Sequence, residues 1–208
     1  RDKNKLNGKT TVPQSINLNP EACVLVISGP NAGGKSLTLK TCGLLQCMLQ
    51  SGLLIPVEPT SKACVFSQIY TDIGDNQSIE NELSTYSYRL KRMKYFLQIF
   101  DAKSILLLDE FGSGSDPELG AALAEVFFNR LAEKNGFAIL TTHYSSIKNR
   151  ATEMEGAING AMRFDVSSLA PLYELELGLP GSSFTFEVAQ KMGIDKQSIT
   201  EAKKRLGA

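Results

Sequence analysis

Apolar runs of strand length alternate with longer segments of helical periodicity along this chain. Three short runs are apolar at nearly every position, which is typical of parallel strands covered on both faces; with one further strand-like run they predict strands at residues 23–28, 63–70, 105–108 and 137–140. Helical spacing of apolar residues predicts helices at residues 37–49, 78–100 and 117–132. The alternation predicts an α/β fold, with an open, doubly wound and mostly parallel sheet between flanking helices.

The chain divides into three expected segments. Residues 1–19 are polar and predict an irregular lead-in, residues 20–178 a globular body, and residues 179–208 two short helices separated by Gly193 and Asp195. In the last segment an apolar stripe favours packing on the body or on a partner subunit, although a DNA-reading helix-turn-helix is an alternative. The stripe consists of Ile199, Ala202 and Leu206. Within the body, residues 37–49 are apolar on nearly every face, which predicts a buried central helix.

Residues 29–36, GPNAGGKS, match the phosphate-binding pattern G-x-x-x-x-G-K-[ST] at a transition from strand to helix. The glycines allow consecutive N–H groups to face an anion, and the first turn of the helix adds its unpaired N–H groups. Lys35 can reach the β- and γ-phosphates, and Ser36 can offer its hydroxyl to Mg²⁺. The motif predicts ATP or GTP as the ligand. The expected nucleotide-binding residues are Gly29, Pro30, Asn31, Ala32, Gly33, Gly34, Lys35, Ser36 and Leu37.

Two adjacent carboxylates follow the apolar run at residues 105–108. Asp109 is placed to hold Mg²⁺, usually through water, and Glu110 is placed to orient or deprotonate an attacking water. Neighbouring side chains on a strand point in opposite directions, so two separate roles are more natural than one shared metal site. The alternative is that both residues only cap the end of a strand.

His143 and Asp116 have structural as well as functional interpretations. His143 is the one histidine of the chain and follows the strand expected to neighbour residues 105–108. Asp116 precedes Pro117 and suits a helix N-cap for backbone reasons alone. The arrangement resembles that of ATP-binding-cassette enzymes. By that resemblance His143 would sense the γ-phosphate, and Asp116 would cross a dimer interface.

The composition is that of an ordinary globular domain, with 42% hydrophobic and 21% charged residues among 208. Its 22 basic and 22 acidic residues cancel, so a nucleic-acid contact is expected elsewhere. Four cysteines in apolar surroundings and without a C-x-x-C pair indicate buried, reduced thiols and a cytoplasmic location. No apolar stretch approaches the roughly 20 residues that span a bilayer, so no membrane partner is expected. The chain begins with Arg1, which suggests a fragment of something longer.

Beyond the phosphate loop, further segments follow in a characteristic order: DIGDNQSIENELSTYS, LLLDEFGSGSDPELGAALA, TTHY and GLPGSSFTFEVAQKMGI. In order and spacing they resemble the ATPase domain of the MutS family of DNA-repair proteins, from about Val12 to the C-terminus. Ala32 stands where mismatch-repair members typically carry methionine, and residues 115–117 stand where they carry a Thr-Ser segment. These departures resemble the bacterial MutS paralogue that lacks a mismatch-reading domain and usually ends in a small nuclease domain.

The resemblance implies an ABC-type P-loop NTPase that hydrolyses ATP to ADP and phosphate. Ser36 and Asp109 would hold Mg²⁺, and Lys35, Glu110 and His143 would be catalytic. It also implies a homodimer, formed through the nucleotide-sandwich face, that couples nucleotide state to DNA-binding parts outside this chain. The alternative is a nucleotide-gated dimerisation clamp with little turnover, acting on branched DNA or stalled ribosomes.

In such a dimer, each nucleotide is held by one phosphate loop and approached by the partner's signature helix. By motif position that signature is Ser84 and Thr85, for which hydroxyls on an exposed helical turn are the simpler interpretation. The resemblance assigns Asn31 to the γ-phosphate and Val12 to the adenine. Thr11 stands where many members have an aromatic residue beside the base, which leaves the source of adenine stacking open.

Overall fold

The computed structural model describes residues 5–6, 9–74, 82–113, 117–165, 167–168, 170–182 and 185–205. At residues 5–6, 9–10, 31, 82–85, 117 and 185 it describes the backbone alone.

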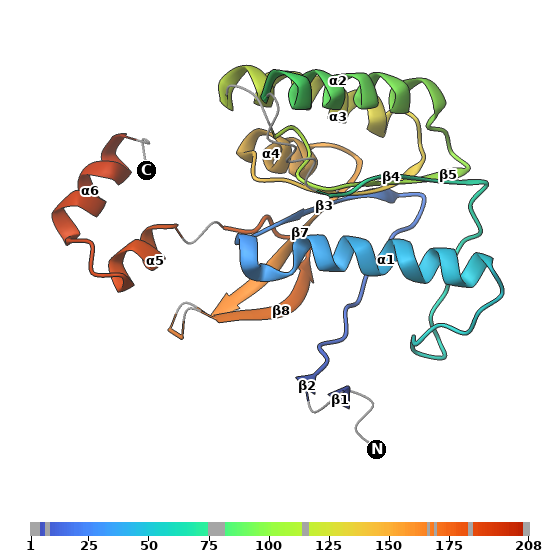
Figure 1. The fold of residues 1–208 in the computed structure, drawn as a ribbon, viewed down its shortest axis with the longest axis horizontal. Coiled ribbons are helices and arrows are strands. Elements are labelled where there is room, and N and C mark those ends of the chain that lie inside the picture. The colour runs from blue at the N-terminus through green and yellow to red at the C-terminus, as the bar shows by residue number, and fades with distance from the viewer. Residues whose placement is uncertain are drawn as a thin grey trace.

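A six-stranded sheet forms the centre of the fold (Figure 1), with strand order β4-β5-β6-β3-β7-β8. Its strands are β3 (Ala22–Ser28), β4 (Gln68–Asp72), β5 (Ser104–Leu108), β6 (Phe137–Thr141), β7 (Gly156–Asp165) and β8 (Ala170–Leu177). The first five strands of that order run parallel, and β8 pairs antiparallel with β7. The prediction of an open, mostly parallel sheet is confirmed.

Helices cover both faces of the sheet. On one face lies α1 (Lys35–Gln50); on the other lie α2 (Glu82–Ile99), α3 (Pro117–Ala132) and α4 (Ser145–Glu153) (Figure 1). Alternate residues of each central strand enter opposite clusters: Val24 and Leu106 pack with the helices α2–α4, whereas Leu25 and Leu107 pack towards α1. The central strands therefore read as continuous apolar runs because both of their faces are buried.

The strand expected at residues 63–70 is shorter in the structure, where β4 starts at Gln68. The N–H of Phe66 donates to Oε1 of Gln50 at 2.8 Å, and Nε2 of Gln50 donates to the Phe66 carbonyl at 3.0 Å. A side chain of α1 therefore satisfies backbone groups that a neighbouring strand would otherwise bond. The prediction was wrong for residues 63–67.

The apolar composition of α1 predicted a helix buried on every side, but one side of α1 is exposed. Leu37 and Leu44 are 64% and 61% exposed, and Leu39 is fully buried. The helix covers one face of the sheet, and its other side faces away from the sheet (Figure 1). The expectation of a fully buried central helix was therefore wrong.

The four cysteines differ in exposure. Cys23 is buried and Cys42 is half-buried, and burial raises the pKa of the Cys42 thiol to about 11. Cys47 and Cys64 are exposed. All four are free thiols, but the expectation that all four are buried was wrong for the last two.

The helix expected at residues 78–100 is present as α2, which begins at Glu82. Residues 75–81 lie outside the described part of the chain. The helix at residues 117–132 is confirmed as α3. α4, β7 and β8 were not predicted.

The two ends of the chain add short elements. β1 (Lys5–Leu6) and β2 (Lys9–Thr10) form an antiparallel pair inside the lead-in that was expected to be irregular. Near the other end, the predicted helices are present as α5 (Thr185–Lys191) and α6 (Lys196–Arg205), set to one side of the sheet (Figure 1). Asp195 caps α6, since its Oδ1 accepts from the N–H of Ser198 at 2.8 Å.

The apolar stripe of the tail is seen in part. Ile199 is buried, Ala202 is half-buried, and Leu206 lies outside the described residues. The ammonium of Lys203 lies 5.3 Å from the ring centre of Phe186, which joins α6 to α5. Packing of the stripe on a partner subunit stays a prediction. In the described parts of the chain, no helix is long and apolar enough to cross a bilayer.

Candidate functional site

Three adjacent parallel strands end at the same edge of the sheet. β3, β6 and β5 lie side by side, so the residues after Ser28, Thr141 and Leu108 meet there. In open α/β sheets, ligands bind outside the carboxyl ends of the strands. This edge is therefore where the predicted site residues are expected to come together.

The loop at residues 29–36 runs from β3 into α1 through a 3₁₀ turn, Asn31–Gly33 (η1). Gly29 and Gly34 have φ of 136° and 96°, a region that favours glycine. A Cβ at Gly29 or Gly33 would lie 3.1 or 3.2 Å from Cβ of Met162 on β7, so the loop needs small residues for its close approach. Among the described side chains none caps the first turn of α1, and that turn holds no acidic residue. Its N–H groups and the positive end of the helix dipole are available to an anion.

Lys35 places a buried cation at this loop. Its side chain is 4% exposed, and Nζ donates to the carbonyl oxygens of Gly29 at 2.9 Å and Pro30 at 3.0 Å. Burial lowers the pKa of Lys35, and the charges of Glu110 and Asp109 partly oppose that shift. A desolvated ammonium is stabilised by negative charge, so the loop suits an anionic ligand.

Asp109 joins the phosphate loop to the strands β5 and β6. Its Oδ1 accepts from Oγ of Ser36 at 2.9 Å and from Oγ1 of Thr141 at 2.7 Å. Ser36 and Asp109 are 73 positions apart in the sequence, and both were predicted as metal ligands. Thr141, which ends β6 and is fully buried, was not predicted. Its place in the TTHY segment could have indicated it, because it lies at the carboxyl end of the strand next to β5.

Glu110 occupies an unusual backbone conformation for a residue that is not glycine, with φ of 49°. Its N–H donates to Oγ1 of Thr141 at 2.8 Å, and its carbonyl oxygen accepts from Nη1 of Arg89 at 3.2 Å. Strained backbone of this kind persists only where the surroundings hold it, and such positions cluster at functional sites. Because the strand ends at Leu108, Asp109 and Glu110 are free to take different directions.

His143 follows β6, which neighbours β5 as predicted. The residue is exposed at the edge that carries the loop, although part of its side chain is covered. Partial burial lowers the pKa of His143, as does the charge of Lys35, while Glu110 acts in the opposite direction. This shift favours the neutral form of the imidazole, which lies within electrostatic range of the lysine and the carboxylates.

β8 brings an aromatic residue to the loop that sequence reasoning missed. Tyr173 has φ of 56°, and Cδ1 of its ring would lie 3.1 Å from a Cβ at Gly34. The ring is 45% exposed, so one side of it can accept a further contact. Alternation of apolar and polar residues at 173–177, YELEL, is the signal of a half-buried strand that could have placed it.

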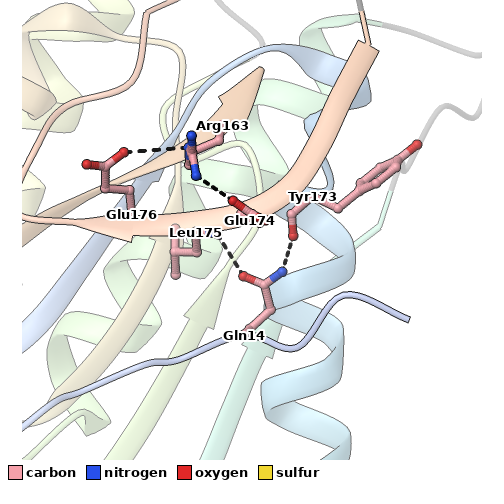
Figure 2. A network of polar contacts seen from close by, with 6 residues as sticks. All are labelled: Gln14, Arg163, Tyr173, Glu174, Leu175 and Glu176. Atoms are coloured by element: carbon pink, nitrogen blue, oxygen red, sulfur yellow. Dashed lines mark hydrogen bonds and ion pairs between the residues drawn. The ribbon is translucent and has the colours of Figure 1, made fainter. Parts of the chain in front are cut away.

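Gln14 fastens the lead-in segment to β8 (Figure 2). Its Nε2 donates to the carbonyl oxygen of Tyr173, and its Oε1 accepts from the N–H of Leu175 at 2.9 Å. The side-chain amide thus bonds this strand edge as another strand would. Val12, two residues earlier, is half-buried on the same segment and was predicted to lie near the adenine. On β8 itself, Glu174 pairs with Arg163 of β7 at 2.6 Å (Figure 2).

A second tether lies at the start of the phosphate loop. The N–H of Gly181 donates to Oγ of the buried Ser28 at 2.7 Å, and Nζ of Lys148 donates to the Gly181 carbonyl at 3.2 Å. The segment that leads to α5 is therefore bonded directly to the residue before Gly29.

The structure brings together the central residues of the predicted site: Gly29, Pro30, Gly33, Gly34, Lys35, Ser36, Asp109 and Glu110. Ala32 and Leu37 are exposed at the loop and the first turn of α1. For four further predicted residues no side chain is described. They are Asn31, Ser84, Thr85 and Asp116.

The oxygen atoms at Ser36 and Asp109 fit a hard divalent cation. Mg²⁺ prefers oxygen ligands and is usually held by one or two carboxylates together with water and substrate phosphates. Within the described residues there is no group of three or more His, Cys, Asp or Glu side chains that could enclose a metal. A hydroxyl and a carboxylate beside an anion-binding loop therefore suit Mg²⁺ that arrives with a phosphate ligand.

Comparisons with known proteins agree on one family. Residues 25–208 match the family model described as MutS domain V. "Endonuclease MutS2" of Thermomicrobium roseum is 46% identical over 203 residues, which is 98% of this chain and 26% of that protein. The proteins of the same name from Enterococcus faecalis and Finegoldia magna are each 45% identical over 201 residues, 97% of this chain. This chain spans about a quarter of the length of the curated relatives it matches.

Proposed function

Because the chain belongs to the MutS domain V family, we propose that it is the ATP-hydrolysing module of a MutS-type DNA-repair or recombination protein. The reaction is the hydrolysis of ATP to ADP and phosphate, with Mg²⁺, in an ABC-type P-loop site.

The observation that carries this proposal is the hydrogen bond from Ser36 to Asp109, at 2.9 Å. It brings the last residue of the phosphate loop within hydrogen-bonding distance of the first carboxylate after β5, which supports the proposal that the two residues share one metal ion. With Mg²⁺ and ATP bound there, the neighbouring Glu110 would be close enough to act on the attacking water.

The residues divide the chemistry among them. The N–H groups of the glycine-rich loop and the first turn of α1 bind the phosphates, and Lys35 neutralises their charge. Ser36 and Asp109 would hold Mg²⁺, which would neutralise negative charge on the phosphate oxygens. Glu110 orients the attacking water and accepts its proton. His143, with its neutral imidazole, hydrogen-bonds the γ-phosphate.

The adenine of ATP is proposed to lie between the lead-in segment and β8. Val12 provides an apolar contact, and Tyr173 supplies the aromatic ring that Thr11 cannot. The anchoring of both segments by Gln14 supports this placement.

We further propose that the module works as a homodimer and in the cytoplasm. Ser84 and Thr85 of one subunit would approach the nucleotide bound by the other, so each site is completed by its partner. DNA, or a ribosome, would be contacted by parts of the full-length protein outside this chain, to which the nucleotide state is coupled.

Replacing Glu110 with glutamine tests the reaction. The Glu110→Gln variant keeps the shape of the side chain but cannot accept a proton, so kcat should fall by about 10²- to 10⁴-fold with ATP affinity retained. Glu133→Gln, at an exposed position of the loop after α3, is the matched control and should keep the wild-type rate. Undiminished hydrolysis in Glu110→Gln would remove this residue from its role.

The dimer proposal has a separate test in the concentration dependence of turnover. A site completed by a partner should show specific activity that rises with protein concentration as dimers form. Specific activity that is constant with concentration would indicate a self-sufficient monomer. ATP-driven dimerisation with negligible turnover would favour the nucleotide-gated clamp instead.

A further inference from the structure

One arginine of α2 is bonded to the loop that carries Glu110. Nη1 of Arg89 donates to the carbonyl oxygens of Glu110 and Ser113, each at 3.2 Å, and to Oγ of Ser113. The arginine is half-buried beside a small hollow between α2, this loop and α3. A guanidinium offers several donors in one plane, so it can hold several acceptors at once.

Three bonds hold the peptide groups on either side of the strained Glu110 backbone. Oγ1 of Thr141 accepts from the Glu110 N–H at 2.8 Å. The Glu110 carbonyl accepts from the N–H of Ser113 at 3.1 Å and from Arg89 at 3.2 Å. Thr141 belongs to the rigid sheet, and Ser113 to the same loop as Glu110. Arg89 is the member of this set that belongs to a separate helix.

The far side of the same loop has no room to move. A Cβ at Gly112 would lie 2.7 Å from Cβ of Ala124 on α3 and 2.7 Å from the ring of Tyr144. The loop is therefore packed closely against Ala124 and Tyr144 at Gly112, which limits how far it can yield on that side. Because the Glu110 carbonyl carbon is bonded to the Cα, a shift of this carbonyl that moves the Cα also moves the attached carboxylate side chain.

Arg89 lies about one helical turn after Ser84 and Thr85. A helix is stiff over such a distance, so a shift of its first turn also moves the guanidinium. This geometry relates one end of α2 to the loop after β5 in the same subunit.

We propose that Arg89 is a positioning residue, which makes the orientation of the Glu110 carboxylate depend on the position of α2. When the first turn of α2 engages a partner's nucleotide, Arg89 holds Glu110 in the hydrolytic orientation of its own site. The inference rests on the proposed function, because it assumes that Glu110 acts on the attacking water.

The test compares Arg89→Gln, Arg89→Lys and Arg92→Gln in the full-length protein. Arg92 is the matched control, because it lies on the same helix but donates to the carbonyl of Thr71 on β4. Arg89→Gln should lower kcat by about tenfold and leave KM for ATP within about twofold, since it affects orientation and not binding. Arg89→Lys keeps the charge and N–H donors but not the planar guanidinium, so it should recover part of kcat. Arg92→Gln should keep the wild-type kcat.

The concentration dependence of turnover gives a readout that loss of packing alone would not move. Specific activity of the wild type should rise with protein concentration, and the rise should be weaker in Arg89→Gln. A wild-type kcat in Arg89→Gln, or an equal loss in Arg92→Gln, would overturn the proposal.

Hydrogen–deuterium exchange tests the same link without relying on catalysis. Arg89→Gln should speed amide exchange across residues 110–113 and leave the amides of β3 unchanged. Unchanged exchange at residues 110–113 contradicts the inference even where the protein hydrolyses ATP. Conversely, a wild-type protein without turnover contradicts the proposed function, while faster exchange in Arg89→Gln still supports the physical link.

Discussion

Replacing Thr141 with valine removes one hydroxyl that contacts both Asp109 and Glu110. That hydroxyl donates to Oδ1 of Asp109 at 2.7 Å and accepts from the N–H of Glu110 at 2.8 Å. Valine has nearly the same shape, so Thr141→Val changes the hydrogen bonds and leaves the packing of β6 intact. Asp109 keeps Ser36 as a donor, whereas the Glu110 N–H loses its acceptor.

Both losses can be given a magnitude. A hydrogen bond to a charged group contributes about 1.5–3 kcal/mol, and an amide left without a partner costs about 1–3 kcal/mol. Asp109 and Glu110 are only half-buried, so water replaces part of what is lost. We expect the free energy of unfolding to fall by about 2–3 kcal/mol. A catalytic group displaced by about 1 Å can lose a hundredfold in rate, so kcat should fall by about 10- to 100-fold.

Urea unfolding and steady-state ATP turnover of Thr141→Val and Thr141→Ser check this reasoning. Serine keeps the hydroxyl and loses one buried methyl group, so it should cost about 1 kcal/mol and retain most of kcat. Equal losses of kcat in the two variants would show that the methyl group matters and the hydroxyl does not. Wild-type turnover in Thr141→Val would refute the role of this residue.

Two further predictions concern the close contact of Gly181 with Ser28 and the titration of His143. In Gly181→Ala the new Cβ would lie 2.7 Å from the Ser28 carbonyl, which is backbone and cannot yield, so thermal unfolding should show a loss of about 1–3 kcal/mol. In Gly43→Ala the new Cβ meets a side-chain methyl of the buried Leu107 at 2.7 Å and not the backbone, and alanine gains up to about 1 kcal/mol of helix propensity. The loss should therefore be smaller than in Gly181→Ala; equal losses would contradict the argument. Because partial burial and Lys35 lower the pKa of His143, the unfolded chain takes up its proton more readily. The free energy of unfolding should therefore fall as the pH drops below about 6.5, and it should fall less in His143→Gln. Denaturant titrations at several pH values test this. The same pH dependence of stability in wild type and variant would contradict the prediction.

The strands at the centre of the sheet were predictable because burial on both faces requires an apolar composition. β3, β5 and β6 are covered on both faces, so nearly all of their residues are apolar. β7 contains Gly156, Asn159 and Gly160, which are poor strand formers, and so it carries no such mark. Gly160 is there because Leu25 and Leu175 approach it from neighbouring strands, which no local pattern can reveal.

The same contrast applies to the site. The glycines, Lys35 and Ser36 were found from a motif, because a phosphate-binding loop of this kind draws its residues from one short stretch of sequence. Asp109 and Glu110 were found because they end an apolar strand. Thr141, Gln14 and Arg89 were missed, since each acts on residues far away along the chain.

The sequence by itself determined the backbone elements of the sheet centre and the chemical groups of the phosphate loop. Both depend on interactions among residues close together in the chain, through backbone conformation and the periodic burial of apolar side chains. Only the tertiary structure decided which further distant groups meet: the hydroxyl of Thr141 with Asp109, and Tyr173 with the loop at Gly34. The physical reason is that strand order and register bring these atoms within hydrogen-bonding or packing distance, and both arise from pairings across the whole sheet.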